Sequence, residues 1–78
     1  MITKNMTLRT IDNVRIMQDI IKPFEIDIDL KLGSYVVDAR SFMGVMGLDL
    51  SREVTMILHT DNKEIANNVF NALDKGGI

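Results

Sequence analysis

The segment Asp38-Ala39-Arg40-Ser41-Phe42-Met43-Gly44-Val45-Met46-Gly47-Leu48-Asp49-Leu50 lies at the centre of the chain, after a strand-like run. Within it, Phe42, Met43 and Met46 recur at the spacing of a helix. Ser41 directly precedes them, and a serine oxygen at that position can accept from the free N–H groups of a first helical turn. The segment therefore predicts a short helix over residues 41–47 that begins at a serine cap.

The chain has 78 residues, which is enough for a single domain over residues 1–78. A domain of this size buries only about 60% of its unfolded surface, so its core must be efficient. It contains no cysteine, which excludes disulfides and fits a cytoplasmic location. Lys4, Asn5 and Thr7 interrupt any signal-peptide core, and no apolar run is long enough to span a membrane.

The charges argue against nucleic acid or a membrane as a partner. Nine basic residues are scattered among eleven acidic ones, for a net charge of −2. Nucleic-acid binding normally needs a clustered positive face. Gly44 and Gly47 lie in an apolar run without the lysine of a phosphate-binding loop, so we expect no cofactor there. Six methionines are available to fill the core or to form an adaptable contact surface.

Upstream of the central segment, alternating residues predict a strand over 1–9, and Lys4 marks it as an edge strand. A helix is expected over 10–21, with Thr10 as its cap. Pro23 disfavours the helical region for Lys22 and should therefore end the helix. The apolar residues at helical spacing in this helix are Val14, Ile16, Met17, Ile20 and Ile21. Alternation from Phe24 to Leu32 predicts the next strand, and Gly33-Ser34 suits a type II′ hairpin leading into a strand over 35–39.

Downstream of the central segment, residues 53–60 alternate as a strand. Asp61 and Glu64 resemble a capping box with the aspartate as cap. The helix that follows has an apolar stripe and ends at Gly76-Gly77. The stripe consists of Ile65, Ala66, Val69, Phe70 and Leu73. The expected fold is α+β, a four-stranded antiparallel sheet with helices packed on one face in the order β-α-β-β-α-β-α.

Few residues could take part in catalysis or bind a metal. His59 is the only histidine, and no cysteine or second histidine remains to complete a metal site. It falls in a predicted strand, where an exposed or half-buried histidine is the ordinary interpretation, and no nucleophile can be paired with it. Asp27 and Asp29 share one face of a strand and are interpreted as solvated surface. We therefore expect no metal site, and we expect that the chain is not an enzyme.

Ser41 has two interpretations. As a helix cap it stabilises the fold by about 1 kcal/mol. As a phosphorylation site it would gain roughly −1.5 to −2 charges beside Phe42, Met43 and Met46, which would change the choice of partner. The residues alone leave both interpretations open.

The run from Ala39 to Leu48 resembles the regulatory serine segment of HPr, the phosphocarrier protein of the bacterial sugar phosphotransferase system. The family pattern there is Ala-Lys-Ser-Ile-Met-Gly-Val-Met-Ser-Leu, with Arg40 at the lysine. The resemblance extends through Phe24, the hairpin at Gly33-Ser34 and the last helix. It implies an open-faced β-sandwich with a four-stranded antiparallel sheet.

The resemblance fails at the phosphoacceptor. Counting back from Ser41 places the family histidine on Thr10, its arginine on Asp12 and its proline on Asn13. Threonine is a poor group for a reversible phosphoryl relay, and Asp12 would repel a phosphate. The resemblance is therefore closer to the catabolite-repression HPr-like proteins, which also lack the histidine and keep the serine.

This resemblance implies a regulatory protein-binding module of carbon catabolite control, switched at Ser41 by HPr kinase/phosphorylase and read by a transcriptional regulator. Arg40, Phe42, Met43 and Met46 would form the contact surface. The alternatives are a plain interaction module on a diverged HPr fold, and a true phosphocarrier. We expect a monomer or a weak dimer, since an N-terminal edge strand permits dimerisation by strand exchange.

Overall fold

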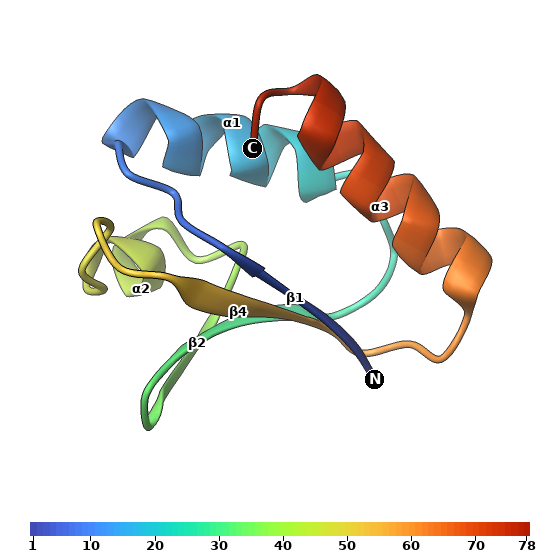
Figure 1. Cartoon of the computed structure of the whole chain (residues 1–78), viewed down its shortest axis with the longest axis horizontal. Coiled ribbons are helices and arrows are strands. Elements are labelled where there is room, and N and C mark those ends of the chain that lie inside the picture. The colour runs from blue at the N-terminus through green and yellow to red at the C-terminus, as the bar shows by residue number, and fades with distance from the viewer.

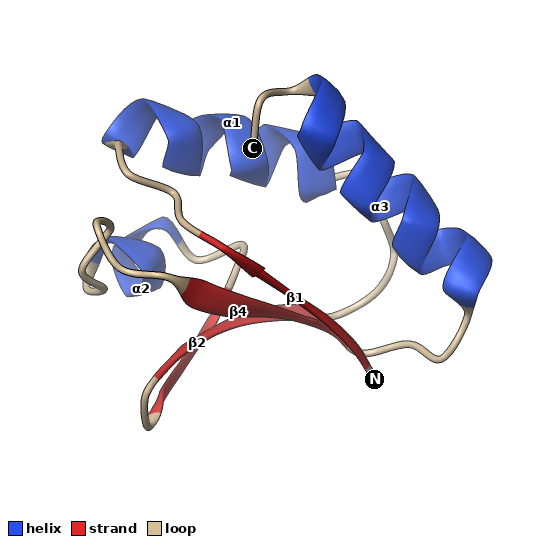
Figure 2. Cartoon of the chain, viewed as in Figure 1, coloured by secondary structure: helices blue, strands red, loops and turns tan.

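The computed structural model describes the whole chain, residues 1–78, as seven elements in the expected order (Figures 1 and 2). These are β1 (Ile2–Met6), α1 (Ile11–Ile21), β2 (Ile28–Leu32), β3 (Tyr35–Asp38), α2 (Phe42–Met46), β4 (Val54–Leu58) and α3 (Lys63–Lys75). None of the helices has the length and apolar character needed to cross a membrane.

The four strands form one antiparallel sheet in the order β1-β4-β2-β3, so β1 and β3 are its edges. The predicted α+β class and the edge position of the first strand are confirmed. Leu32 pairs with Tyr35 across the predicted two-residue turn. Gly33 has a φ of +61°, whereas Ser34 has no positive φ. This combination fits a type II′ turn and excludes type I′, which needs positive φ at both residues.

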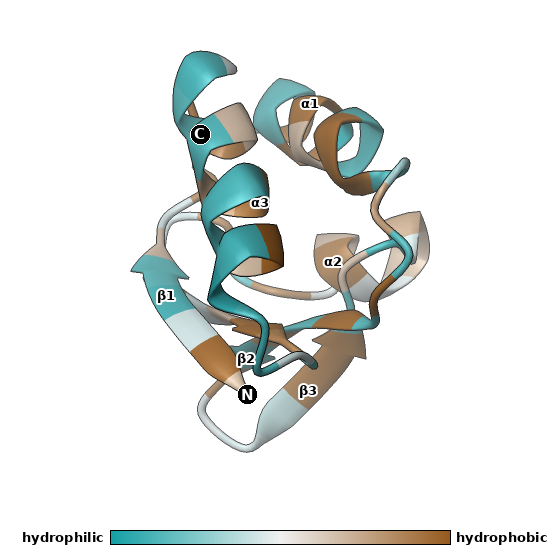
Figure 3. Ribbon diagram, turned by 90° about the vertical axis from the view of Figure 1, so that its right-hand side faces the viewer, coloured by the Kyte–Doolittle hydropathy of each residue, from teal (hydrophilic) through white to brown (hydrophobic).

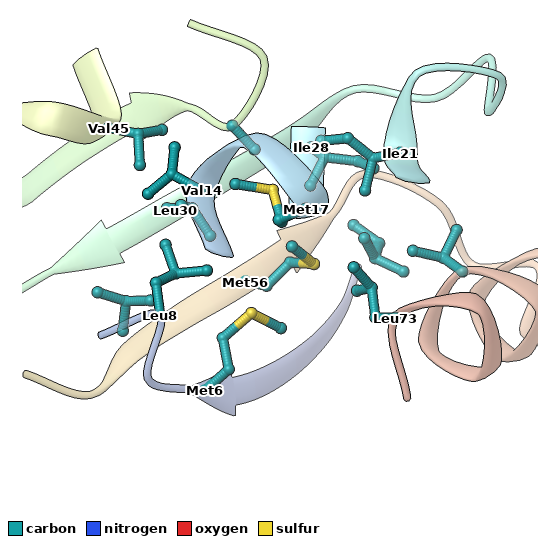
Figure 4. Close-up of a cluster of buried hydrophobic side chains, with 14 of the residues drawn as sticks. Met6, Leu8, Val14, Met17, Ile21, Ile28, Leu30, Val45, Met56 and Leu73 are labelled. Carbon is teal, nitrogen blue, oxygen red and sulfur yellow. The ribbon is translucent and has the colours of Figure 1, made fainter. Parts of the chain in front are cut away.

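All three helices lie on one side of the sheet, and the apolar core fills the space between the two layers (Figures 1 and 3). Alternate residues of β4, namely Val54, Met56 and Leu58, are buried. The predicted stripes of α1 and α3 supply the other side of the core. Figure 4 shows Met17 of α1 among the buried side chains of the sheet. Burial of such side chains stabilises the fold by about 1.5–3 kcal/mol each.

The strand predicted from Phe24 to Leu32 is too long, because β2 begins only at Ile28. Its partner β4 ends at Leu58, which pairs with Ile28, so residues 24–27 have no facing strand. The Phe24 N–H instead donates to the Ile21 carbonyl at 3.1 Å, just after α1. Phe24 and Ile26 still pack against the core, which explains why their apolar pattern continues into a loop.

Three local predictions also need correction. The cap of α3 is Asn62 rather than Asp61, because the Asn62 side chain accepts from the Glu64 and Ile65 N–H groups. Lys22 remains in the right-handed helical region although Pro23 follows it. Ile16 lies outside the buried stripe of α1 and is 40% exposed. The end of α1 at Ile21 and its cap at Thr10 are as predicted.

Candidate functional site

Ser41 is the cap of α2, as its position before the apolar run predicts. Its Oγ accepts from the Gly44 N–H at 3.1 Å, and its carbonyl accepts from the Val45 N–H at 3.0 Å. The serine itself is exposed. The hydroxyl is therefore held by the helix and remains open to solvent.

The α2 helix has one buried and one exposed side. Val45 is fully buried and lies near Val14 in the core (Figure 4). Met43 is 80% exposed, the largest exposed fraction of any large apolar side chain in the chain. Phe42 and Met46 are half-buried and pack against the core. The exposed side of α2 thus presents the three apolar residues that the sequence placed in the contact surface.

Helix α1 extends this surface. The Arg15 guanidinium lies over the Phe42 ring, with 5.5 Å between its carbon and the ring centroid. Ile11, four residues before Arg15 and so on the same side of α1, is 47% exposed. We call Ile11, Arg15, Phe42, Met43 and Met46 the α1–α2 patch. The contributions of Ile11 and Arg15 were not predicted, because α1 was interpreted only through its buried stripe.

Arg40 belongs to a different environment from the patch residues with which the sequence grouped it. Its guanidinium donates to the Ile26 carbonyl at 2.8 Å and to the Ile21 carbonyl at 3.1 Å, and it also bonds the Phe24 carbonyl. Its N–H donates to the Asp38 carboxylate at 2.8 Å. Arg40 therefore fastens the segment before α2 to the loop after α1.

The corner at Thr10, where counting back from Ser41 places the family histidine, is closed by its own hydrogen bonds. The Thr10 Oγ1 accepts from the Asn13 N–H at 3.1 Å. The Asn13 side-chain amide donates to the Leu8 carbonyl at 2.8 Å, and the Thr10 N–H donates to the same carbonyl at 3.0 Å. Asp12 is exposed in the first turn of α1. His59, the only histidine of the chain, lies after β4, and Arg9 directly precedes Thr10.

Arg9 is the only non-glycine residue with a positive φ, at 77°. The bond from the Thr10 N–H to the Leu8 carbonyl closes a three-residue turn around it. Positive φ is unfavourable for a side chain with a Cβ, at roughly 1–2 kcal/mol. The connection between β1 and α1 therefore holds backbone strain.

The sequence predicted that His59 lies inside a strand. In the structure it lies just after the end of β4. Its Nε2 lies 2.7 Å from the Asp29 carboxylate, and its N–H donates to the Asp27 carbonyl at 3.0 Å. With Asp38 these residues border an open hollow of about 500 Å³. No serine, threonine or cysteine lines the hollow, so this pair joins β4 to β2 and has no nucleophile to activate.

Asp49, which follows α2, is an exposed carboxylate with a lowered pKa. The Ser51 hydroxyl donates to it at 2.6 Å and the Ser51 N–H at 3.0 Å. These two bonds are the main cause that lowers the pKa of Asp49, and the charge of Arg52 adds to them. The bonds order the turn that leads from α2 to β4.

No family model matches the sequence, and no curated protein matches it. Solved structures do match. HPr-C-His from Thermoanaerobacter tengcongensis superposes with a TM-score of 0.75 at 17% identity, covering 97% of this chain and 94% of that one. HPr from Bacillus anthracis gives a TM-score of 0.65 at 16% identity, covering 91% and 94%.

The catabolite repression protein Crh of Bacillus subtilis gives a TM-score of 0.66 at 25% identity, covering 88% of this chain and 83% of that one. Crh is described as an intertwined dimer with a swapping domain. The chain therefore has the HPr fold, and the resemblance to the HPr family that the segment around Ser41 predicts is confirmed.

Proposed function

We propose that the chain is a regulatory protein-binding module of the HPr type, acting in the cytoplasm in carbon catabolite control, and not a phosphocarrier. The proposal is carried by the exposed Met43 next to the capping Ser41. A solvent-open hydroxyl that borders an apolar contact surface is suited to a switch, because a phosphate there adds charge at the edge of the interface.

The Thr10 corner supports the part of the proposal that excludes the carrier role. A phosphoryl relay needs a nucleophile that accepts the group and also releases it readily. Thr10 Oγ1 is occupied as a helix cap, and Asp12 contributes a negative charge beside it. Incubation with labelled phosphoenolpyruvate and the first enzyme of the phosphotransferase system should leave this chain unlabelled. Acid-labile label on the chain would establish the carrier function instead.

In this proposal an HPr kinase/phosphorylase phosphorylates Ser41, and a transcriptional regulator binds the phosphorylated form. The α1–α2 patch is the binding surface, with Arg40 supporting it through the loop after α1. The resemblance to Crh, which is described as a catabolite repression protein, favours this choice of partners. A plain interaction module would use the same patch without modification of Ser41.

The patch can be tested with one exposed substitution and a matched control. Met43→Asp places a charge in the patch without disturbing the core, because the side chain is 80% exposed. Ile16→Asp makes a similar change on α1 at a residue that is 40% exposed and outside the patch. Proteins retained by the wild-type chain and by Ile16→Asp should be lost from Met43→Asp. Equal retention by all three would show that the patch is not the interface.

A dimer formed by exchange of β1 is a second assembly that a specific observation favours. β1 is an edge strand, and the short connection to α1 contains the strained Arg9. Strained hinge loops favour exchange of the element that they connect. Sedimentation equilibrium should show a dimer that weakens in Arg9→Gly, because glycine adopts positive φ without strain. A wild-type chain that stays monomeric at millimolar concentration would refute this assembly.

A further inference from the structure

Arg15 is a cation without an acidic partner. Ion pairs join Met1 to Asp61 and Lys4 to Asp74, His59 contacts the Asp29 carboxylate, and none of these contacts includes Arg15. Its guanidinium is placed over the Phe42 ring, so the charge is oriented by α2 and is not held in a close ion pair. A guanidinium stacked in this way keeps its planar edge available for a second group.

Exposed apolar side chains lie beside Arg15, in addition to Asp12 and Asp19 on the same helix. Ile11 is 47% exposed one turn earlier on α1, and Met43 is 80% exposed on α2. A partner that covers these side chains removes water from the guanidinium as well, and charge-assisted hydrogen bonds become stronger when water is excluded. Carboxylate geometry matches the guanidinium edge, which allows two parallel hydrogen bonds.

Resting on the proposed function, we infer that the partner of the α1–α2 patch is a protein segment in which one carboxylate stands beside a large apolar side chain. The carboxylate binds Arg15, and the apolar side chain packs on Met43 and Ile11. Methionine surfaces adapt to the shape of such an anchor.

The distribution of charge selects a single carboxylate over a polyanion. Asp12 and Asp19 are exposed on the same helix as Arg15, and the chain has a net charge of −2. These acidic groups repel a phosphodiester backbone or an anionic lipid surface, both of which need several cations to bind. One carboxylate in register with Arg15 avoids most of this repulsion.

The test is selection of peptides from a displayed random library on the immobilised full chain. The wild-type chain should select peptides with Asp or Glu within a turn of Leu, Ile, Met, Phe or Trp. Arg15→Gln, which keeps the length and polarity of the side chain without its charge, should no longer select the acid. For a synthetic copy of the selected peptide, Arg15→Gln should weaken binding by about tenfold or more, the size expected for one charge-assisted hydrogen bond.

A double-mutant cycle separates this inference from the proposed function. Changing the peptide carboxylate to an amide should weaken binding to the wild-type chain by the same factor as Arg15→Gln does. The same change in the peptide should hardly alter its binding to Arg15→Gln. Peptides without acidic residues, or a loss in Arg15→Gln below twofold, would overturn the inference about Arg15. If Met43→Asp also binds the selected peptide normally, the α1–α2 patch is not the binding surface, and the proposed function is contradicted at that point.

Discussion

The Oγ of Ser41 accepts a hydrogen bond from the Gly44 N–H at 3.1 Å, and this contact begins α2. A Cβ added to Gly44 would lie 3.1 Å from the same Oγ. The Ser41 cap therefore needs a residue without a side chain at position 44. The serine that resembles the family's regulatory residue is held in place by a glycine three residues further along.

Replacing Ser41 tests its contribution to the fold. Ser41→Ala removes the acceptor for the Gly44 N–H and should lower the free energy of unfolding by about 1 kcal/mol, as for other helix caps. Ser41→Asp keeps an acceptor at the cap and should unfold at a higher urea concentration than Ser41→Ala. Urea titration followed by circular dichroism measures both. An equal loss in the two variants would show that the cap bond does not stabilise α2.

Gly44→Ala tests the close approach. In an open helix this change would raise stability by about 1 kcal/mol. Here the new Cβ would lie 3.1 Å from Ser41 Oγ and 3.3 Å from Ser41 Cβ, both tighter than ordinary contacts, so we expect no gain or a loss. In a Ser41→Ala background the contact with Oγ is absent, and the same change should be more favourable than in the wild type. Equal effects of Gly44→Ala in both backgrounds would contradict this coupling.

Arg40→Lys tests the connection between α2 and the loop after α1. A lysine ammonium cannot reproduce the planar geometry with which the guanidinium reaches the Ile21, Phe24 and Ile26 carbonyls. Because Arg40 is exposed, we expect a loss of only about 1–2 kcal/mol in the free energy of unfolding. Arg52→Lys is the matched control, since Arg52 is also exposed and its guanidinium, unlike that of Arg40, donates to no carbonyl.

Hydrogen exchange locates the Arg40 effect. Arg40→Lys should speed exchange of the amides around residues 24–27 more than that of amides in α3. Equal stability of Arg40→Lys and Arg52→Lys would show that the three carbonyl bonds are dispensable.

Asp49 makes a pH-dependent contribution to the stability of the fold. Its pKa lies below the ordinary value of 3.8, because Ser51 donates two hydrogen bonds to the carboxylate. The charged form is thus favoured by folding, so the stabilisation is present above the ordinary pKa and is lost as the pH falls through the lowered one.

Asp49→Asn should accordingly reduce the urea midpoint at pH 7, and the difference from the wild type should shrink as the pH falls below the ordinary pKa of 3.8. Urea titrations at a series of pH values make this comparison. A difference that stays constant from pH 7 to pH 2 would exclude the charge of Asp49 as its cause.

Local patterns were sufficient to predict the order of the elements. Alternation along β4 and the apolar spacing in α3 report burial directly, and Thr10 and Ser41 are caps as expected. The cap of α3 was harder to predict, because Asp61 and Asn62 are both good cap residues. Only the backbone conformation decides which of them caps the helix. The start of β2 was missed because apolar residues continue beyond the end of its partner strand.

The role of Arg40 could not be predicted, because its partners are backbone carbonyls 14 and 19 residues earlier, and carbonyls leave no mark in the sequence. The stacking of Arg15 on Phe42 depends in the same way on how α1 packs against α2. Phe42, Met43 and Met46 of the patch were predicted because their helical spacing can be read from the sequence, whereas Ile11 was missed.

Treatment of the full chain with an HPr kinase and ATP, followed by mass spectrometry of its peptides, tests the proposed switch most directly. Ser41→Ala is the control for site identity, and an HPr protein known to be a substrate is the control for enzyme activity. The proposed switch predicts one acid-stable phosphate on Ser41 and none on the Ser41→Ala chain. An unmodified Ser41, with the control HPr fully phosphorylated, would contradict the switch and leave the α1–α2 patch as a plain interaction surface.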